Sequence, residues 1–105
     1  MMIEYNKLVR DKIPQLIEQQ GEKAHIQILD EKEYTKELLK KLNEEVNEYL
    51  ESQDVEELAD ILEVIYAICE SKTITLDELE KRRLEKFYKR GGFSQRIFLI
   101  NKEEI

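Results

Sequence analysis

Acidic residues crowd the stretch KLNEEVNEYLESQDVEELAD, residues 41–60, where they alternate with Leu, Val and Tyr at helical spacing. An advance of about 100° per residue around a first predicted helix places Glu45 beside the apolar stripe and Glu48 one turn along on the same side. On a second helix, Glu57 falls within the apolar arc and Asp60 borders it. Two pairs of acids at i, i+3 are therefore predicted to tilt towards the interior.

A carboxylate in such a position needs a cation, because an unpaired buried charge costs several kcal/mol. Two such helices in an antiparallel hairpin bring four oxygen ligands together near the connecting turn. Hard oxygen ligands suit Mg²⁺ or Mn²⁺, which keep some waters and bind substrate phosphates. The pattern thus predicts a divalent-cation site formed by Glu45, Glu48, Glu57 and Asp60.

The other acids of the two helices project towards solvent. Glu44 and Glu51 lie far from the apolar stripe of the first helix, and Glu56, Glu63 and Glu70 stack into a solvated stripe on the second.

A structural interpretation accounts for part of the same pattern. Asp54-x-x-Glu57 matches a helix capping box, and Lys41 precedes Glu45 by four residues, the spacing of a helical ion pair. Periodicity alone leaves both interpretations open.

Three sequence blocks carry a resemblance to a known family. EEVNE followed by EELAD resembles the E-E-x-x-E... E-x-x-D signature of the MazG-like, all-α nucleoside triphosphate pyrophosphohydrolases. YNKLVRDKIPQLI near the start and KRGGF near the end look like the small phosphoribosyl-ATP pyrophosphohydrolase-like branch of that superfamily. The three blocks occur in order and cover most of the chain.

The resemblance implies both a reaction and its residues. The family's magnesium ligands fall on Glu45, Glu48, Glu57 and Asp60, with Glu44 as a further acid in some members. Such enzymes cleave between the α and β phosphates of a nucleotide, releasing the monophosphate and pyrophosphate. A metal-bound water attacks and a nearby carboxylate takes its proton, a role for which we nominate Glu44 or Glu48.

Basic residues near both ends are candidates for binding the substrate's phosphates. Lys89 and Arg90 precede two glycines whose backbone N–H groups can approach phosphate closely, although basic residues also favour a helix C-terminus. A second basic cluster comprises Lys7, Arg10 and Lys12, in which Arg10 has Asp11 as an alternative ion-pair partner. Nearby aromatic residues are interpreted as core: Tyr5, Phe87, Tyr88 and Phe93.

The elements that position these residues are predicted to be mainly α-helical, forming a helical bundle. Pro14 is the only proline, and the glycines are Gly21, Gly91 and Gly92. Ser52 or Asp54 is the expected N-cap of the second hairpin helix, and Thr75-x-x-Glu78 opens a further one. Predicted helices span residues 10–21, 33–51, 54–71 and 75–91, and residues 24–29 and 95–100 are expected to pair as a small two-stranded sheet.

Length and composition restrict the class of protein. A chain of 105 residues predicts one domain, residues 1–105, and a net charge of −7 argues against a nucleic-acid partner. The single Cys69 lies in an apolar run and indicates a reducing compartment, so we expect a cytoplasmic protein with no membrane association. The wide apolar arc of the second hairpin helix predicts a homodimer or homotetramer.

The sequence therefore favours a Mg²⁺-dependent nucleoside triphosphate pyrophosphohydrolase, with house-cleaning of non-standard nucleotides as a possible task. One alternative is phosphoribosyl-ATP pyrophosphohydrolase, an activity of histidine biosynthesis. Another is a non-catalytic helical interaction module whose acids serve only caps and ion pairs.

Overall fold

The computed structural model describes residues 1–105 and contains four α-helices and no strand. The chain divides into two compact units, Met1–Thr73 and Ile74–Ile105, which are described separately. The first unit holds α1 (Ile13–Gln19), α2 (Glu31–Ser52) and α3 (Val55–Ser71), and the second holds α4 (Leu76–Arg90). The prediction of a mainly helical fold is confirmed, and the single domain predicted for residues 1–105 stays a prediction.

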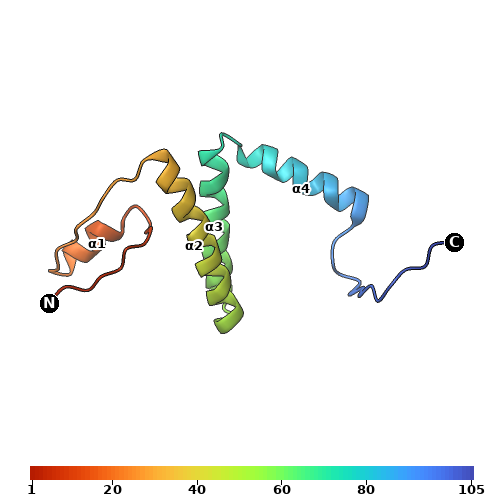
Figure 1. Ribbon diagram of the computed structural model, residues 1–105, viewed down its shortest axis with the longest axis horizontal. Helices are drawn as coiled ribbons and strands as arrows, with labels where there is room; N and C mark the ends of the chain where they lie inside the picture. Colours follow the sequence, from red (N-terminus) through yellow and green to blue (C-terminus); the bar gives the residue numbers. More distant parts are fainter. The chain divides into compact units, whose positions relative to one another are not determined.

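The α2–α3 hairpin is the framework of the first unit, and its two helices pack side by side (Figure 1). Asp30 caps α2 by accepting a hydrogen bond from the Glu33 N–H at 2.8 Å. The connecting turn is short because Gln53 adopts a left-handed conformation with φ 56° and donates its N–H to the Tyr49 carbonyl. Asp54, one of the two predicted caps, then starts α3 by accepting from the Glu56 N–H at 3.0 Å.

The core of this hairpin is small. Leu38, Val64 and Cys69 are buried, which confirms the prediction that the cysteine is a core residue. Apolar side chains also remain exposed on both helices: Leu39, Val46 and Leu50 on α2, and Val55, Leu58 and Leu62 on α3.

The N-terminal segment, residues 1–12, has no regular secondary structure and leads into the short α1. Pro14 lies in the first turn of α1, where its missing N–H has no intrahelical acceptor to lose. Beyond the helix, Gly21 has φ +84°, a conformation that a residue with a Cβ rarely adopts. Both features agree with the predicted start and stop of this helix.

Helix α4 is the regular element of the second unit. Thr75 Oγ1 accepts from the Glu78 N–H at 3.1 Å, which confirms the predicted N-terminal cap. The helix ends before Gly91, whose φ is +81° and whose N–H donates to the Phe87 carbonyl.

The predicted two-stranded sheet is wrong. Residues 24–29 and 95–100 form no strand, and most of their apolar side chains, including Ile28 and Phe98, are exposed. Alternating hydrophobicity stabilises a strand only where a neighbouring strand accepts its hydrogen bonds and covers its apolar face. Neither segment has such a neighbour.

The interpretation of four aromatic residues as core is also wrong. Tyr5, Phe87, Tyr88 and Phe93 are all exposed in the structure. Phe87 and Tyr88 are adjacent on α4, and their rings meet edge to face with centroids 5.9 Å apart. The unit containing α4 has no fully buried residue, so these rings have no core to enter.

None of the four helices combines the length and apolar character that a membrane span requires.

Candidate metal centre

The hairpin brings carboxylates from both helices together, as the sequence predicts. Ligand oxygens from Glu45 on α2 and from Glu57 and Asp60 on α3 all lie within 4.8 Å of one another. We call this set the interhelical group.

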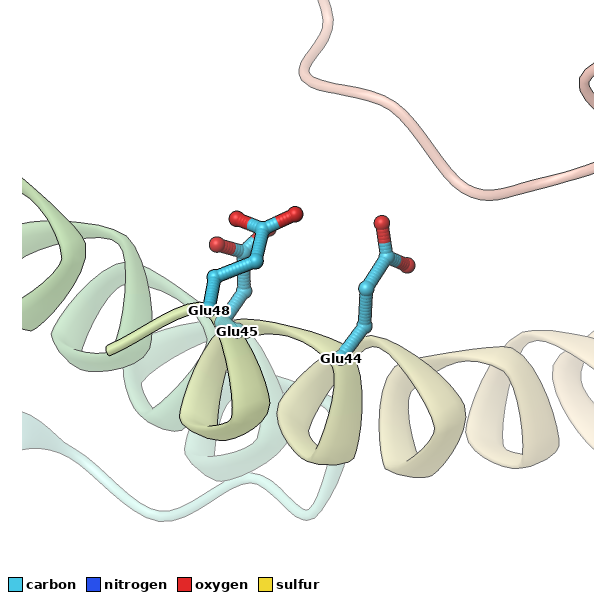
Figure 2. Close-up of side chains that lie close together, drawn as sticks. All are labelled: Glu44, Glu45 and Glu48. Carbon is cyan, nitrogen blue, oxygen red and sulfur yellow. The ribbon is translucent and has the colours of Figure 1, made fainter. Parts of the chain in front are cut away.

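A second set on α2 shares one member with the first. Oxygens of Glu44, Glu45 and Glu48 also lie within 4.8 Å of one another, and we call this set the α2 group. Figure 2 shows its three carboxylates pointing to the same side of the helix. The two groups together form an acidic cluster of five carboxylates, with Glu45 common to both.

Glu45 is the buried member of the acidic cluster, with only 6% of its surface exposed. Its Oε1 contacts the Lys41 ammonium at 3.3 Å, whereas its Oε2 is buried and has no hydrogen-bond partner. Burial raises the pKa of the Glu45 carboxyl, and neighbouring Glu48 raises it further, against the lowering effect of Lys41. The interior therefore holds a carboxylate oxygen that is not fully neutralised.

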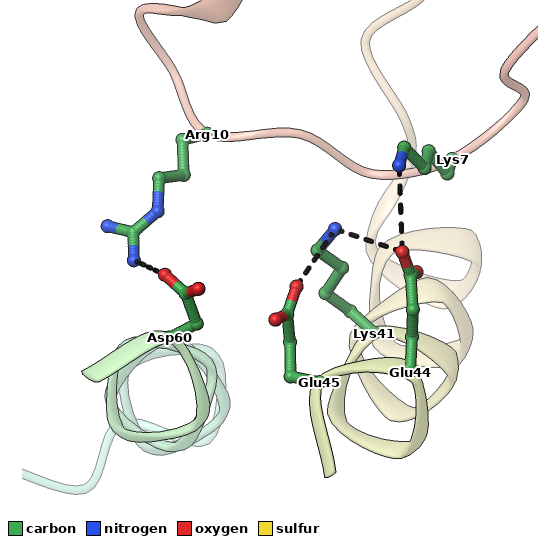
Figure 3. A network of polar contacts seen from close by, with 6 residues as sticks. All are labelled: Lys7, Arg10, Lys41, Glu44, Glu45 and Asp60. Atoms are coloured by element: carbon green, nitrogen blue, oxygen red, sulfur yellow. Dashed lines mark hydrogen bonds and ion pairs between the residues drawn. The ribbon is translucent and has the colours of Figure 1, made fainter. Parts of the chain in front are cut away.

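The N-terminal segment supplies cations to the rim of the cluster (Figure 3). Arg10 Nη2 donates to Asp60 Oδ1 at 2.7 Å, a contact between residues fifty positions apart. Lys7 Nζ lies 3.6 Å from Glu44 Oε1, and Lys41 Nζ lies at the same distance from that oxygen. This arrangement depends on the path of the chain over the hairpin, which no local pattern predicts.

Glu48 and Glu57 complete the cluster without a basic partner, since no Lys or Arg lies within ion-pair distance of either. The capping-box interpretation of Glu57 does not hold. Asp54 caps α3 through the N–H of Glu56, and the Glu57 side chain donates and accepts no hydrogen bond. Glu57 is thus available to a ligand, as is the exposed Glu48.

Helical projection placed most of these acids well and two of them poorly. Glu45 is buried, Glu57 and Asp60 are half-buried, and the predicted solvated stripe of Glu56, Glu63 and Glu70 is exposed. Glu48, however, is exposed rather than tilted inward, and Glu44 is half-buried rather than fully solvated. The N-terminal segment covers Glu44, and a projection of one helix cannot include a segment from elsewhere in the chain.

The predicted phosphate-binding residues are distributed over the two units. Lys7 and Arg10 reach the acidic cluster, and Lys12 precedes α1 without an ion pair to any acid of the cluster. Lys89 and Arg90 form the last turn of α4, in the other unit. Lys41, considered in the sequence only as a structural partner of Glu45, makes that contact and also meets Glu44.

The cluster passes two tests for a divalent ion. Its donor atoms are all carboxylate oxygens, which suit Mg²⁺ and Mn²⁺ better than softer metals. It also contains the unpartnered Oε2 of Glu45, and a buried polar atom without a partner is rare in a folded protein. An ion held by the interhelical group would supply the missing partner.

Comparisons with protein families, with curated proteins and with solved structures find no match for this chain. The resemblance to MazG-like pyrophosphohydrolases therefore rests on the sequence motifs alone.

Proposed function

We propose that this protein is a Mg²⁺-dependent nucleoside triphosphate pyrophosphohydrolase, with Mn²⁺ as an alternative ion. It would convert a nucleoside triphosphate to the monophosphate and pyrophosphate, with non-standard nucleotides as a candidate substrate class. The proposal joins the sequence resemblance to the chemistry of the acidic cluster.

One observation supports the metal most strongly. Glu45 is buried, shared by both carboxylate groups, and keeps one oxygen without a partner. Burying an ionised carboxylate is unfavourable unless hydrogen bonds, counter-charges or a metal satisfy it. Lys41 meets only one of the two oxygens, so the fold tolerates an unsatisfied charge at this position. Such a cost is expected at a functional site.

The residues of the acidic cluster would have different roles in metal binding and proton transfer. Glu45, Glu57 and Asp60 would hold the ion, which supplies charge neutralisation at phosphate and activation of water when bound. Glu48 is predicted as a further ligand and also as the proton acceptor. Its exposure and its lack of a basic partner suit the second role, because a free carboxylate is available to take a proton from water. Glu44 is the less suitable base, since two ammonium groups share its Oε1.

Lys7 and Arg10 would meet the phosphate chain at the rim of the cluster. Both are on the N-terminal segment and both are more than two-fifths exposed, so their charged groups are accessible to a ligand. Lys12, Lys89 and Arg90 remain candidates for the same role.

The protein is also proposed to act as a homodimer or homotetramer. Several large apolar residues of α2 and α3 stay exposed in the single chain, and exposed apolar patches mark interaction surfaces. A second copy would bury them near the acidic cluster. The buried, unpaired Cys69 is consistent with the proposed cytoplasmic location, where thiols stay reduced.

A non-catalytic interaction module is the second candidate, and the ion pairs favour it. Asp60, Glu44 and Glu45 each already have a basic partner. In such a module the acids would only dock the N-terminal segment onto the hairpin, and the exposed apolar residues would bind a partner protein.

Two measurements separate these functions. Release of pyrophosphate and monophosphate should be followed with Mg²⁺ over a panel of standard triphosphates, non-standard triphosphates and phosphoribosyl-ATP. Turnover of phosphoribosyl-ATP and of no other substrate in the panel would favour the alternative activity, phosphoribosyl-ATP pyrophosphohydrolase of histidine biosynthesis. Calorimetric titration with Mn²⁺ should show saturable uptake for the enzyme, and none for a module whose acids need no further cation.

A further inference from the structure

The two carboxylate groups differ in how far the protein's own cations already occupy them. In the α2 group, Lys41 Nζ lies 3.3 Å from Glu45 Oε1 and 3.6 Å from Glu44 Oε1. Lys7 adds a second ammonium on the same oxygen of Glu44. In the interhelical group, Glu57 has no basic partner, Arg10 contacts one oxygen of Asp60, and Lys41 contacts one oxygen of Glu45, whose other oxygen is free. Glu48 of the α2 group also lacks a basic partner, so the groups differ chiefly in Lys41, whose ammonium bridges two acids of the α2 group but contacts only one acid of the interhelical group.

Lys41 is also the least exposed of these cations. Its side chain is 18% exposed, compared with 56% for Arg10. Lys41 lies on α2 itself, three and four residues before its two acids. Unlike Lys7 and Arg10, it therefore stays beside the acids even when the N-terminal segment moves.

Helix stability is a weak explanation for the placement of Lys41. A helical ion pair is more favourable with the acid on the N-terminal side, and here the lysine precedes both acids. Glu37 and Lys40, next to it on the same helix, have the favourable order. The ammonium of Lys41 is therefore better explained by the acids that it bridges.

The net charge of the acidic cluster also favours a single divalent ion. Five carboxylates meet three cationic side chains, Lys7, Arg10 and Lys41, which leaves an excess of two negative charges. One divalent ion neutralises that excess, whereas a second would add two uncompensated positive charges close to an ammonium. Like charges at such distances repel strongly in a partly buried site.

We propose that Lys41 fills the place of a second metal ion, so that each chain binds one divalent ion, in the interhelical group of Glu45, Glu57 and Asp60. Lys41 is then a positioning residue that fixes the number of ions and holds Glu45 Oε1, leaving the other oxygen to the metal. This inference rests on the proposed function, because it assigns residues within the same metal centre.

The test is a count of bound Mn²⁺, by calorimetry and by the electron paramagnetic resonance of free Mn²⁺. Wild-type protein should bind one ion per chain. Lys41→Gln should bind two, because it removes the only cation on Glu45 and one of the two on Glu44, and both can then act as ligands with Glu48. Lys41→Met, which keeps the length of the apolar stem, should also bind two ions. It replaces the glutamine variant as the test if the glutamine side chain disturbs the packing. Far-UV circular dichroism verifies the fold of each variant.

Two controls isolate the ammonium at this position. Lys41→Arg restores a cation and should return the count to one ion per chain. Lys40→Gln removes the same charge from the next residue, which pairs with Glu37 outside the cluster, and should leave the count at one.

Two bound ions in the wild type, or one in both Lys41→Gln and Lys41→Met, would overturn the inference while leaving a metal centre in place. No saturable uptake by the wild type would instead overturn the proposed function, and the inference with it.

Discussion

The α2–α3 hairpin and α4 are both rich in charge, yet they use that charge differently. On α4, Arg82 donates to Glu78 and Arg83 donates to Glu80, each one turn apart with the acid first, the order that stabilises a helix. The Arg83 guanidinium lowers the pKa of the exposed Glu80 carboxyl. These two ion pairs on α4 are thus formed locally and in water.

The hairpin has no such local balance at its acidic cluster. Glu45 is buried with its pKa raised, and its contact with Lys41 has the less favourable order. Asp60 has its basic partner on the N-terminal segment, and Glu44 shares its oxygen between that segment and Lys41. Charge content therefore does not distinguish a site from a solvated helix, whereas buried and incompletely neutralised charge does.

The largest expected effect concerns turnover. Glu48→Gln keeps the shape of the side chain but removes the proposed proton acceptor, so metal-dependent pyrophosphate release should fall by about 100- to 10,000-fold. The fold should be unchanged because Glu48 is exposed. Glu63→Gln, on the solvated stripe of α3, is the matched control and should retain activity. Equal rates for the two variants would remove the distinction between cluster and stripe.

Metal binding should also stabilise the hairpin. At a Mn²⁺ concentration of about 100 times Kd, the free energy of unfolding of wild-type protein should rise by about 2.7 kcal/mol, because the ion binds only the folded chain. Thermal melts with Mn²⁺ and after chelation measure the effect. Glu57→Gln, which removes a proposed ligand without a basic partner, should lose most of this gain. A similar gain in that variant would show that the ion binds elsewhere.

Glu45 should show the stability cost of the site. Its pKa in the folded chain lies above the ordinary value of 4.5, so its contribution to stability is fully present below that pH and is lost as the pH rises through the folded-state pKa. Glu45→Gln should therefore be more stable than metal-free wild type at neutral pH, by on the order of 1 kcal/mol.

The stability difference between Glu45→Gln and the metal-free wild type should shrink as the pH falls through the folded-state pKa of Glu45. The wild-type carboxyl then becomes neutral, like the amide of the variant. Denaturant unfolding at a series of pH values gives the comparison. A variant that is less stable than the metal-free wild type at neutral pH would contradict the assignment of Glu45 as a destabilising charge.

The smallest effect is expected on α4. Arg82→Gln removes an exposed ion pair of favourable order and should cost only about 0.3 to 0.5 kcal/mol, decreasing with added salt. Mn²⁺ uptake should not change. A large loss of stability, or a change in uptake, would mean that α4 charges do more than balance each other.

Much of the helical framework could be predicted from local signals. Asp54 and Thr75 act as caps where the sequence places them, and the i, i+3 spacing of Glu45 with Glu48 and of Glu57 with Asp60 sets them on one side of each helix. These features depend on a few neighbouring residues, so periodicity and capping preferences suffice. The sheet failed as a prediction because a strand needs a partner that its own sequence does not specify.

Local sequence signals predict four helices close to their observed positions, and they predict that acids from two successive helices lie beside an apolar stripe. No local signal predicts that Arg10 reaches Asp60, that Lys7 contacts Glu44, or that one oxygen of Glu45 stays buried without a partner; these features depend on how the chain packs. The reason is physical: helix formation depends on contacts three or four residues apart, whereas the neutralisation of a buried charge depends on every segment that approaches it.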